Sequence, residues 1–318
     1  MIRVRSPKVS IGLPVFNGES YVGEAIESIL EQSFEDFELI ISDNASSDGT
    51  EDICREFARR DARVQYCRNE SNVGVARNWT KLVEMSSGRY FKWVAHDDVQ
   101  GGELLAKCVE PLDRDPTVVL SYPRARKIDE YGRLRGGKPG RWVHGMSPSP
   151  SERYREVMRL TTFGLPVFAL MRRNLVARTK VYRPYPGSPH VMLSELALYG
   201  RFFEVPEYLV FTREHSGRYS GTKQSTREKL AWFDPGQTRL AFPQWQRLKD
   251  YLVTASHAPI AKSEKWRCYV EAFRWGSRSF GPLAADVLYN LTHPVPRVCR
   301  PSSEESAETP FPEEPVRG

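Results

Sequence analysis

The sequence predicts an α/β protein with a doubly wound, mainly parallel sheet flanked by helices and followed by a C-terminal helical extension. Apolar segments of strand length alternate with amphipathic segments from Val9 to Tyr122, an order typical of a parallel sheet covered by helices. Polar clusters follow three of the apolar segments, at Gly12–Gly18, Ser42–Thr50 and Ala95–Asp98. Ligands of such sheets bind beyond the carboxyl ends of the strands, so these clusters predict one shared site.

The expected elements of this first part follow one another along the chain. Strands are expected at Val9–Leu13, Phe37–Ile41, Arg63–Arg68, Tyr90–Ala95 and Val118–Tyr122. Helices are expected at Glu19–Phe34, Glu51–Arg60 and Val75–Ser86. The first helix carries Val22, Ile26 and Ile29 on one face, and Asp48 or the nearby serines are suited to cap the second.

The second part has a weaker pattern. Arg124–Pro150, rich in Gly, Pro and Arg, is expected to form a loop or short hairpin. The next expected elements are a helix at Ser151–Leu160, a strand at Val167–Arg172, a helix at Val191–Tyr199 and a strand at Tyr208–Arg213. Beyond Gly221 the pattern is helical, with Trp232, Trp245, Trp266 and Trp275 as packing residues. We expect a domain over 1–220 with halves 1–123 and 124–220, a helical extension over 221–300, and a disordered tail over 301–318 that has little apolar content.

Composition narrows the class of protein. The 318 residues are 40% hydrophobic and 27% charged, with a net charge of +6, which is ordinary for a globular chain. No apolar run reaches the roughly 20 residues that cross a bilayer, and the start lacks a signal-peptide core, so a cytoplasmic protein is expected. The five cysteines lack CxxC spacing, which argues against a disulfide framework or zinc site. The sequence has no Lys/Arg block and no RNP motif, so it does not indicate nucleic-acid binding. The Trp and Lys/Arg content of the extension permits peripheral membrane contact.

Five segments together carry a family resemblance. They are Val9-Ser10-Ile11-Gly12-Leu13-Pro14-Val15-Phe16-Asn17-Gly18-Glu19, Ile26–Phe34, Phe37–Thr50, Asn72–Asn78 and His96-Asp97-Asp98-Val99. With these segments in this order, the chain resembles a family 2 glycosyltransferase with the GT-A fold. A weaker resemblance continues from Gly164 to about Ser220. The resemblance implies transfer of a sugar, with inversion, from a UDP- or GDP-sugar to a hydroxyl acceptor in glycan or cell-surface polysaccharide assembly. A dehydrogenase fits worse, because Gly12–Gly18 lacks GxGxxG.

The resemblance implies three elements that bind the sugar nucleotide. Pro14, Phe16, Asn17 and Glu19 match the first, in which Phe16 offers a ring for stacking; a core Phe16 with a simple turn is the alternative. Asp43 matches the acid that accepts from a base N–H, although an Asx turn explains it too. Asn72, Gly74 and Arg77 match the third, in which Gly74 permits close backbone approach and Arg77 reaches phosphate oxygens or is an ordinary surface arginine.

Asp97 and Asp98 match the metal-binding acids of GT-A enzymes. The usual Asp-x-Asp spacing places Ala95 at the first acid and Asp97 at the second, so Asp97 is the expected ligand and Asp98 helps to bind the sugar nucleotide. Mg²⁺ or Mn²⁺ held by one or two carboxylates and substrate phosphate is a common arrangement. His215 matches the C-terminal histidine that reaches the metal or diphosphate, and Gly164 matches a glycine loop near the acceptor.

The catalytic base departs from the family pattern. Gly187-Ser188-Pro189-His190 places Pro189 where the family has an aspartate, and proline cannot accept a proton. His190 adjoins the gap and has a suitable ordinary pKa of about 6.5, whereas Glu195 has the usual chemistry. A catalytically silent sugar-nucleotide-binding protein of the same fold is the alternative. The sequence names neither the sugar nor the acceptor, and leaves the oligomeric state and the role of the extension open.

Overall fold

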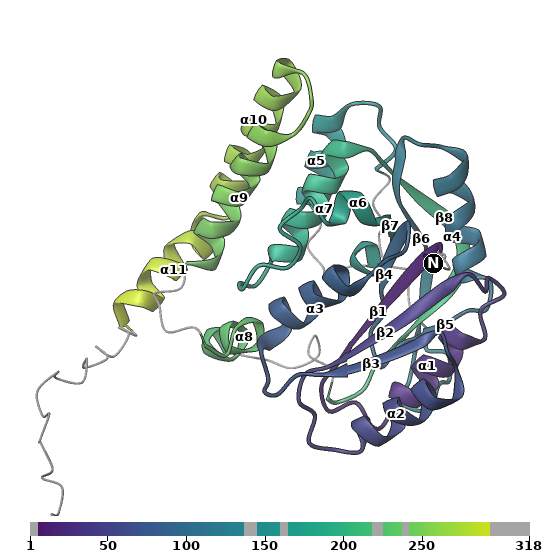
Figure 1. Ribbon diagram of the computed structural model, residues 1–318. Helices are drawn as coiled ribbons and strands as arrows, with labels where there is room; N and C mark the ends of the chain where they lie inside the picture. Colours follow the sequence, from purple (N-terminus) through teal and green to yellow (C-terminus); the bar gives the residue numbers. More distant parts are fainter. Residues whose placement is uncertain (1–5, 137–144, 160–164, 218–224, 237–241, 293–318) are drawn as a thin grey trace, which may run out of the picture.

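The structure is a computed structural model, which describes residues 6–136, 145–159, 165–217, 225–236 and 242–292. Its centre is an eight-stranded sheet in the order β3-β2-β1-β4-β7-β6-β8-β5 (Figure 1). The strands are β1 (Val9–Val15), β2 (Phe37–Asp43), β3 (Val64–Arg68), β4 (Tyr90–Trp93), β5 (Val99–Gln100), β6 (Val118–Ile128), β7 (Leu170–Arg172) and β8 (Arg201–Arg213). The predicted α/β class is confirmed.

The first half of the sheet is parallel throughout. β1 pairs with β2 in the register Val9↔Phe37 and with β4 in the register Val9↔Tyr90, and β2 pairs with β3. The carboxyl ends of these strands therefore form one rim. The second half is mixed: β7 runs antiparallel to β4 and β6, β8 runs parallel to β6, and β5 runs antiparallel to β8.

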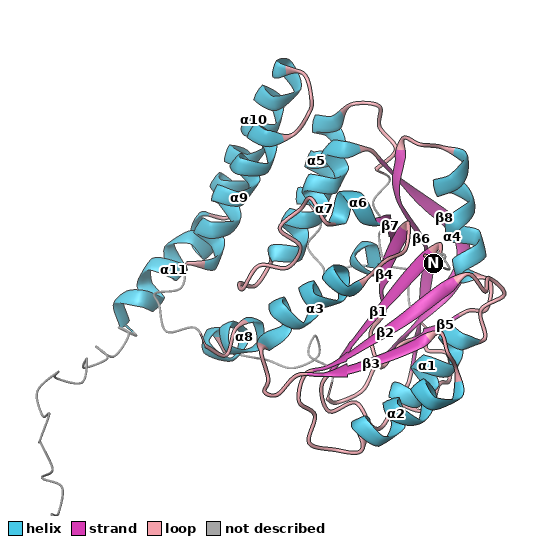
Figure 2. Cartoon of the chain, in the orientation of Figure 1, coloured by secondary structure: helices cyan, strands magenta, loops and turns pink. Residues whose placement is uncertain are grey.

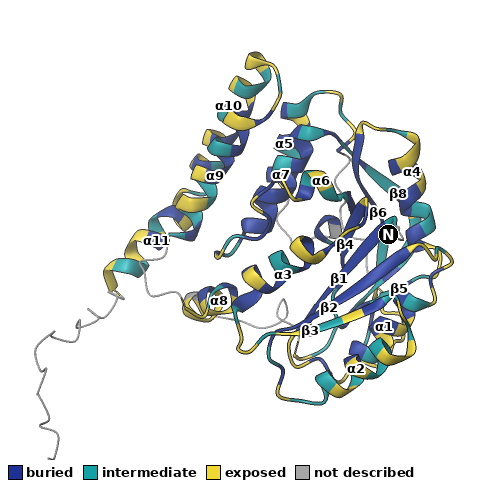
Figure 3. Cartoon of the chain, in the orientation of Figure 1, coloured by how far each residue is buried: buried dark blue, intermediate teal, exposed yellow. Residues whose placement is uncertain are grey.

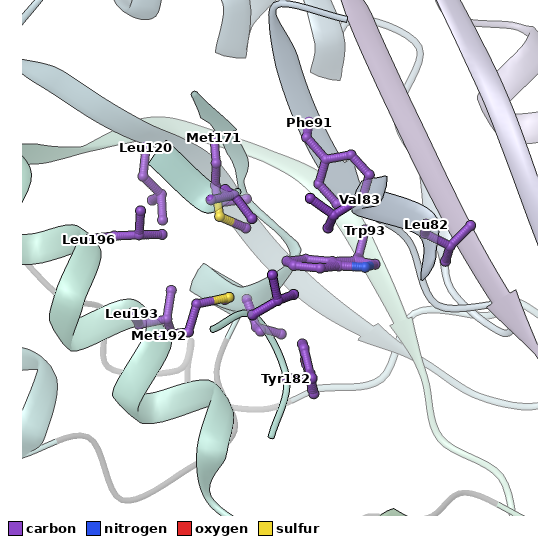
Figure 4. Packing of buried hydrophobic residues seen from close by; sticks show 14 of the residues in the cluster. Leu82, Val83, Phe91, Trp93, Leu120, Met171, Tyr182, Met192, Leu193 and Leu196 are labelled. Carbon is purple, nitrogen blue, oxygen red and sulfur yellow. The ribbon is translucent and has the colours of Figure 1, made fainter. Parts of the chain in front are cut away.

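Helices cover both faces of the sheet (Figure 2). They are α1 (Val22–Leu30), α2 (Thr50–Arg60), α3 (Gly74–Met85), α4 (Leu104–Arg114), α5 (Pro150–Met158), α6 (Arg173–Val176), α7 (Ser188–Tyr199), α8 (Thr226–Phe233), α9 (Pro243–His257), α10 (Lys262–Arg278) and α11 (Phe280–Thr292). Alternate strand residues face opposite layers. Leu39 and Ile41 belong to an apolar cluster that includes residues of α1, α2 and α4, whereas Ile40 belongs to a second cluster that includes residues of α3 and α7. Figure 4 shows Phe91 and Trp93 of β4 among side chains of that second layer.

The C-terminal part is helical, as predicted, and α9–α11 extend along one side of the molecule (Figure 1). A third apolar cluster joins them to α5 and α7, and the Tyr154 hydroxyl donates to the Tyr251 carbonyl at 2.8 Å. The prediction that Trp266 is a packing residue is wrong, because its side chain is largely exposed, and Trp245 is nearly half exposed. Within the part of the chain that is described, no helix has the length and hydropathy to cross a membrane.

Other differences from the prediction have local causes. We predicted no element at α4, where Pro111 interrupts an otherwise regular apolar pattern of Leu105, Val109 and Leu112. β6 continues to Ile128, into the segment expected to be a loop. The strand expected from Val167 begins only at Leu170, after a 3-10 turn. The predicted tail over 301–318 and Gly164 lie outside the described residues, and the domain limits stay a prediction.

Candidate active site

Two strands deliver a carboxylate and an imidazole to one point on the rim. Asp97 lies in the turn after β4, is 8% exposed, and its Oδ2 is 3.0 Å from Nε2 of His215. His215 follows β8 and is 118 residues away in the chain. The structure thus brings together the two residues that the sequence predicted as metal ligands.

Asp98 points to a different partner. It is 4% exposed, and its Oδ1 accepts a hydrogen bond of 3.0 Å from the backbone N–H of Arg213. This bond ties the turn after β4 to the last residue of β8. The adjacent acids therefore have separate environments, with Asp97 directed to His215 and Asp98 to the backbone of β8.

A buried arginine that the sequence did not single out supports this point. Arg213 is only 1% exposed and donates from Nε to the Asp97 carbonyl at 3.0 Å. Its other nitrogens reach the carbonyls of Asp129 and Glu130 and, at 2.5 Å, the Glu24 carboxylate. The Tyr21 ring lies 4.8 Å from the guanidinium carbon and 4.8 Å from the His215 ring. Its place two residues before His215 is the one sequence signal that could have drawn attention to it.

The loop after β1 is held against the loop after β2. Asn17 accepts from the Ser47 N–H at 2.8 Å, Glu19 accepts from the Gly49 N–H at 2.6 Å, and the Gly18 N–H donates to Thr50. Asn17 has a positive φ of 51°, which fits a tight turn. These side chains build the loop and leave the Phe16 ring, 45% exposed, at its surface. Pro14 is buried within β1.

The first loop also touches the acid turn. A side-chain carbon built on Gly18 would lie 2.7 Å from Cδ2 of His96, so only glycine fits there. Burial lowers the pKa of His96, an effect that the neighbouring Asp97 opposes. The loops after β1 and β2 and the turn after β4 are therefore one connected rim.

Asp43, at the end of β2, is fully buried and closes the second loop. Its Oδ1 accepts from the Ser46 N–H at 2.8 Å, three residues further along the chain, one residue beyond the partner in an Asx turn. Its Oδ2 accepts from the Tyr66 hydroxyl and from Arg68, both at 2.8 Å. Burial, with Asp43 as the next cause, raises the pKa of Tyr66. The carboxylate is thus pre-oriented by an arginine and a tyrosine that the sequence prediction did not name.

The third predicted element lies beside the end of β2. Asn72 accepts from the Asn44 amide at 2.8 Å and from the Gly74 N–H at 2.9 Å. Gly74 has a positive φ of 81°, and a side-chain carbon there would lie 2.6 Å from the Phe233 carbonyl of α8. The close approach that Gly74 permits in the structure is therefore to α8. Arg77 is exposed one turn into α3.

The two candidate bases lie at different depths along α7. Tyr182, just before the helix, packs 5.5 Å from Trp93 at the end of β4, whereas Arg201, just after it, bonds to Thr117 at the start of β6. The helix therefore runs away from the rim, and His190 lies about 8 Å nearer the rim than Glu195 along its axis. Tyr199 donates to Glu195 at 3.2 Å, and burial raises the pKa of Glu195.

The site has few metal-binding groups of its own. Among the described residues, no group of three or more His, Cys, Asp or Glu side chains is placed to hold an ion. Asp97 and His215 offer one oxygen and one nitrogen ligand. Mg²⁺ bound by one or two protein groups usually completes its shell with water and substrate phosphate, so this pair fits an ion that is shared with a diphosphate.

Comparison with known proteins shows the family of this chain. Residues 10–179, more than half of the chain, match the model described as Glycosyl transferase family 2. The chain belongs to this family. TuaG of Bacillus subtilis (strain 168), provisionally named a teichuronic acid biosynthesis glycosyltransferase, is 35% identical over 104 residues, which are 33% of this chain and 41% of TuaG. EpsE of the same strain, provisionally named a glycosyltransferase, is 28% identical over 199 residues, 62% of this chain and 67% of EpsE.

The fold of the family 2 chain also has a solved counterpart. The crystal structure of S. aureus TarS residues 1–349 in complex with UDP-GlcNAc superposes with a TM-score of 0.64 over 86% of this chain and 75% of that one, at 16% identity. This likeness concerns the fold. The segment that matches the family model ends before α7 and β8, so the family match does not extend to His190, Glu195 or His215.

A buried lysine lies beneath the acid turn of this family 2 chain. Lys92 of β4 is 1% exposed, and its ammonium donates to the Phe168 carbonyl. Burial lowers its pKa to about 8, although Cys108 and Asp98 oppose the shift. This burial was not predicted, because a lysine in a short apolar segment is usually on the solvated side of a strand.

This lysine predicts a dependence of stability on pH. Below pH 8 the lysine is charged in both states, and burial of the charge costs on the order of 3 kcal/mol. Between about pH 8 and 10.5 the folded protein loses this proton before the unfolded chain does, so the cost disappears as pH rises. Between pH 7 and pH 10, the free energy of unfolding measured in urea should therefore rise by up to about 3 kcal/mol more in wild type than in Lys92→Met. Lys249→Met, which removes an exposed lysine, is the control. If wild type gained as much relative to Lys249→Met as relative to Lys92→Met, the prediction would be contradicted.

Proposed function

We propose that this family 2 chain is a metal-dependent, inverting glycosyltransferase that acts in the cytoplasm. It moves a sugar from a UDP- or GDP-sugar to a hydroxyl acceptor in the assembly of a glycan or cell-surface polysaccharide. The observation that carries the proposal is the Asp97–His215 pair, which joins the ends of β4 and β8 beside the loops after β1 and β2. The name of TuaG supports a polysaccharide product.

We assign each part of the sugar nucleotide to a group on the rim. Asp97 and His215 would hold Mg²⁺ or Mn²⁺, and the bound ion would offset the charge that develops on the departing diphosphate. Asp43, oriented by Arg68, accepts from the base, and the exposed Phe16 ring stacks on it. Arg77 meets phosphate oxygens.

In the transfer, the acceptor oxygen bonds to the anomeric carbon on the face opposite the diphosphate. The bond from that carbon to the diphosphate oxygen breaks, and its electron pair leaves with the diphosphate. The acceptor proton passes to a base. His190 is favoured for this role over Glu195 because it lies at the rim end of α7, whereas Glu195 is bonded to Tyr199 in the far half.

Pro189 favours a second candidate function. It replaces the family's acid at the start of α7, so a silent protein that binds sugar nucleotides without transfer is the alternative. Both candidate functions predict that the protein binds sugar nucleotides, but only the enzyme turns them over.

The deciding measurement is turnover of UDP- and GDP-sugars with Mn²⁺ or Mg²⁺. For an active enzyme we expect turnover by wild type and a loss of about a hundredfold in His190→Asn, at the lower end of general-base effects. Glu195→Gln is the matched control, because it changes a polar side chain of the same helix. Tight nucleotide binding without turnover, restored by Pro189→Asp, would instead establish the silent protein.

A further inference from the structure

The C-terminal helices expose a large apolar surface. Trp266, Phe273, Phe280, Leu288 and Leu291 are each between 61% and 73% exposed. Trp266 and Phe273 are seven residues apart on α10 and so lie on the same side of that helix. Figure 3 shows exposed residues in yellow along α10 and α11. Contiguous exposed apolar patches of this kind mark interaction surfaces.

The exposed side chains belong to one continuous face, which we call the arm face. A shallow groove between α9 and α10 is lined by Leu252, Val253, Trp266 and Phe273. A second groove, between α9 and α11, is lined by Trp245, Phe280 and Leu288. Trp245, Leu252 and Val253 recur on one side of α9, so the two grooves lie along the same helix surface.

The charges around the arm face have one sign. Residues 243–292 contain seven Lys and Arg and four Asp and Glu. Asp250, Glu271 and Asp286 are buried, and Glu264 is mostly buried. The exposed charged residues of this segment are Lys249, Lys262, Arg267, Arg274 and Arg278. Arg267 and Arg274 pair with Glu264 and Glu271 while remaining more than half exposed. The surface is therefore aromatic and cationic.

We propose that the arm face docks on the surface of a bilayer that contains anionic phospholipid. Exposed aromatic and aliphatic side chains bordered by lysine and arginine are the composition that binds the headgroup region. A second copy of the chain fits less well, because a two-fold contact through this face would place cations against cations. In this proposal the helices lie flat on the surface of the bilayer. This surface lies outside the rim site, and the inference does not depend on the proposed transfer.

The test is sedimentation of the full chain with vesicles of phosphatidylcholine, with and without phosphatidylglycerol. We expect the protein to sediment with the anionic vesicles, less so at raised salt, which screens exposed charges. Phe273→Ser combined with Phe280→Ser should weaken binding by about tenfold or more, because two apolar anchors are lost. Tyr131→Ser is the matched control, since Tyr131 and Phe280 are both 73% exposed and Tyr131 lies outside the arm face.

A second variant guards against a folding defect. Lys249→Glu with Lys262→Glu changes two exposed residues and should also reduce binding to the anionic vesicles at unchanged melting temperature. Equal binding to both kinds of vesicle, or no loss in either double variant, would overturn the inference. It would also be overturned if wild type were a dimer in sedimentation velocity and Phe273→Ser with Phe280→Ser made it a monomer.

Discussion

Asp97→Asn is expected to lower metal-supported sugar transfer on the order of 10³-fold, a loss near 4 kcal/mol of transition-state stabilisation. The amide keeps the shape of the side chain, and it can still contact His215, which lies 3.0 Å from the carboxylate. It removes the negative charge that a divalent cation requires. Turnover and the affinity for UDP and GDP should both be measured with and without Mn²⁺. His215→Gln should cost less, because a neutral ligand is lost and the carboxylate stays.

The control for Asp97→Asn is the same substitution at an aspartate that lies away from the rim. Asp52 is exposed on α2, so Asp52→Asn should leave turnover and Mn²⁺-dependent affinity unchanged. If Asp97→Asn left the Mn²⁺-dependent affinity for both nucleoside diphosphates at the wild-type value, the metal role of Asp97 would be refuted. Lost turnover with unchanged affinity would still refute it, because the ion is proposed to join the protein to the diphosphate.

The parts of the fold that position the site could be predicted because each has a local signal. The apolar segments of β1, β2 and β4 end in polar clusters, and parallel pairing alone places those clusters on one rim. Asp97 and His215 were identified by a resemblance in sequence, and their contact joins two strands that are far apart in the chain. The prediction thus named both partners, and the structure supplied the distance between them.

The residues that the prediction missed act through tertiary contacts. Arg213 looks like an ordinary arginine at a strand end, because its burial depends on carbonyls contributed by the turn after β6 and by Asp97. Arg68 and Tyr66 meet Asp43 only when β3 pairs with β2. The prediction for Gly74 missed a tertiary contact in the same way. Gly74 was expected to permit the close approach of a ligand, but the group that lies close to it is the Phe233 carbonyl, more than 150 positions further along the chain.

Arg213→Met should destabilise the fold by about 3 kcal/mol or more, measured as the free energy of unfolding in urea. Arginine is costly to bury, so the loss of its charge opposes this effect. The lost hydrogen bonds are expected to dominate, because the carbonyls of Asp97, Asp129 and Glu130 stay behind and methionine cannot donate to them. Arg213→Lys should recover part of the stability, since an ammonium reaches some of these acceptors.

Glu24→Gln separates the carbonyl bonds of Arg213 from its ion pair. The Glu24 side chain is 52% exposed, so water solvates it when the pair is broken, and the expected loss is below about 1 kcal/mol. A large loss in Glu24→Gln with little in Arg213→Met would show that the ion pair, rather than the carbonyl bonds, stabilises the joint between β4 and β8. We expect the larger loss of stability in Arg213→Met. In that case, nucleotide affinity should fall in Arg213→Met even under conditions where the variant is fully folded, because the backbone of Asp97 is no longer held.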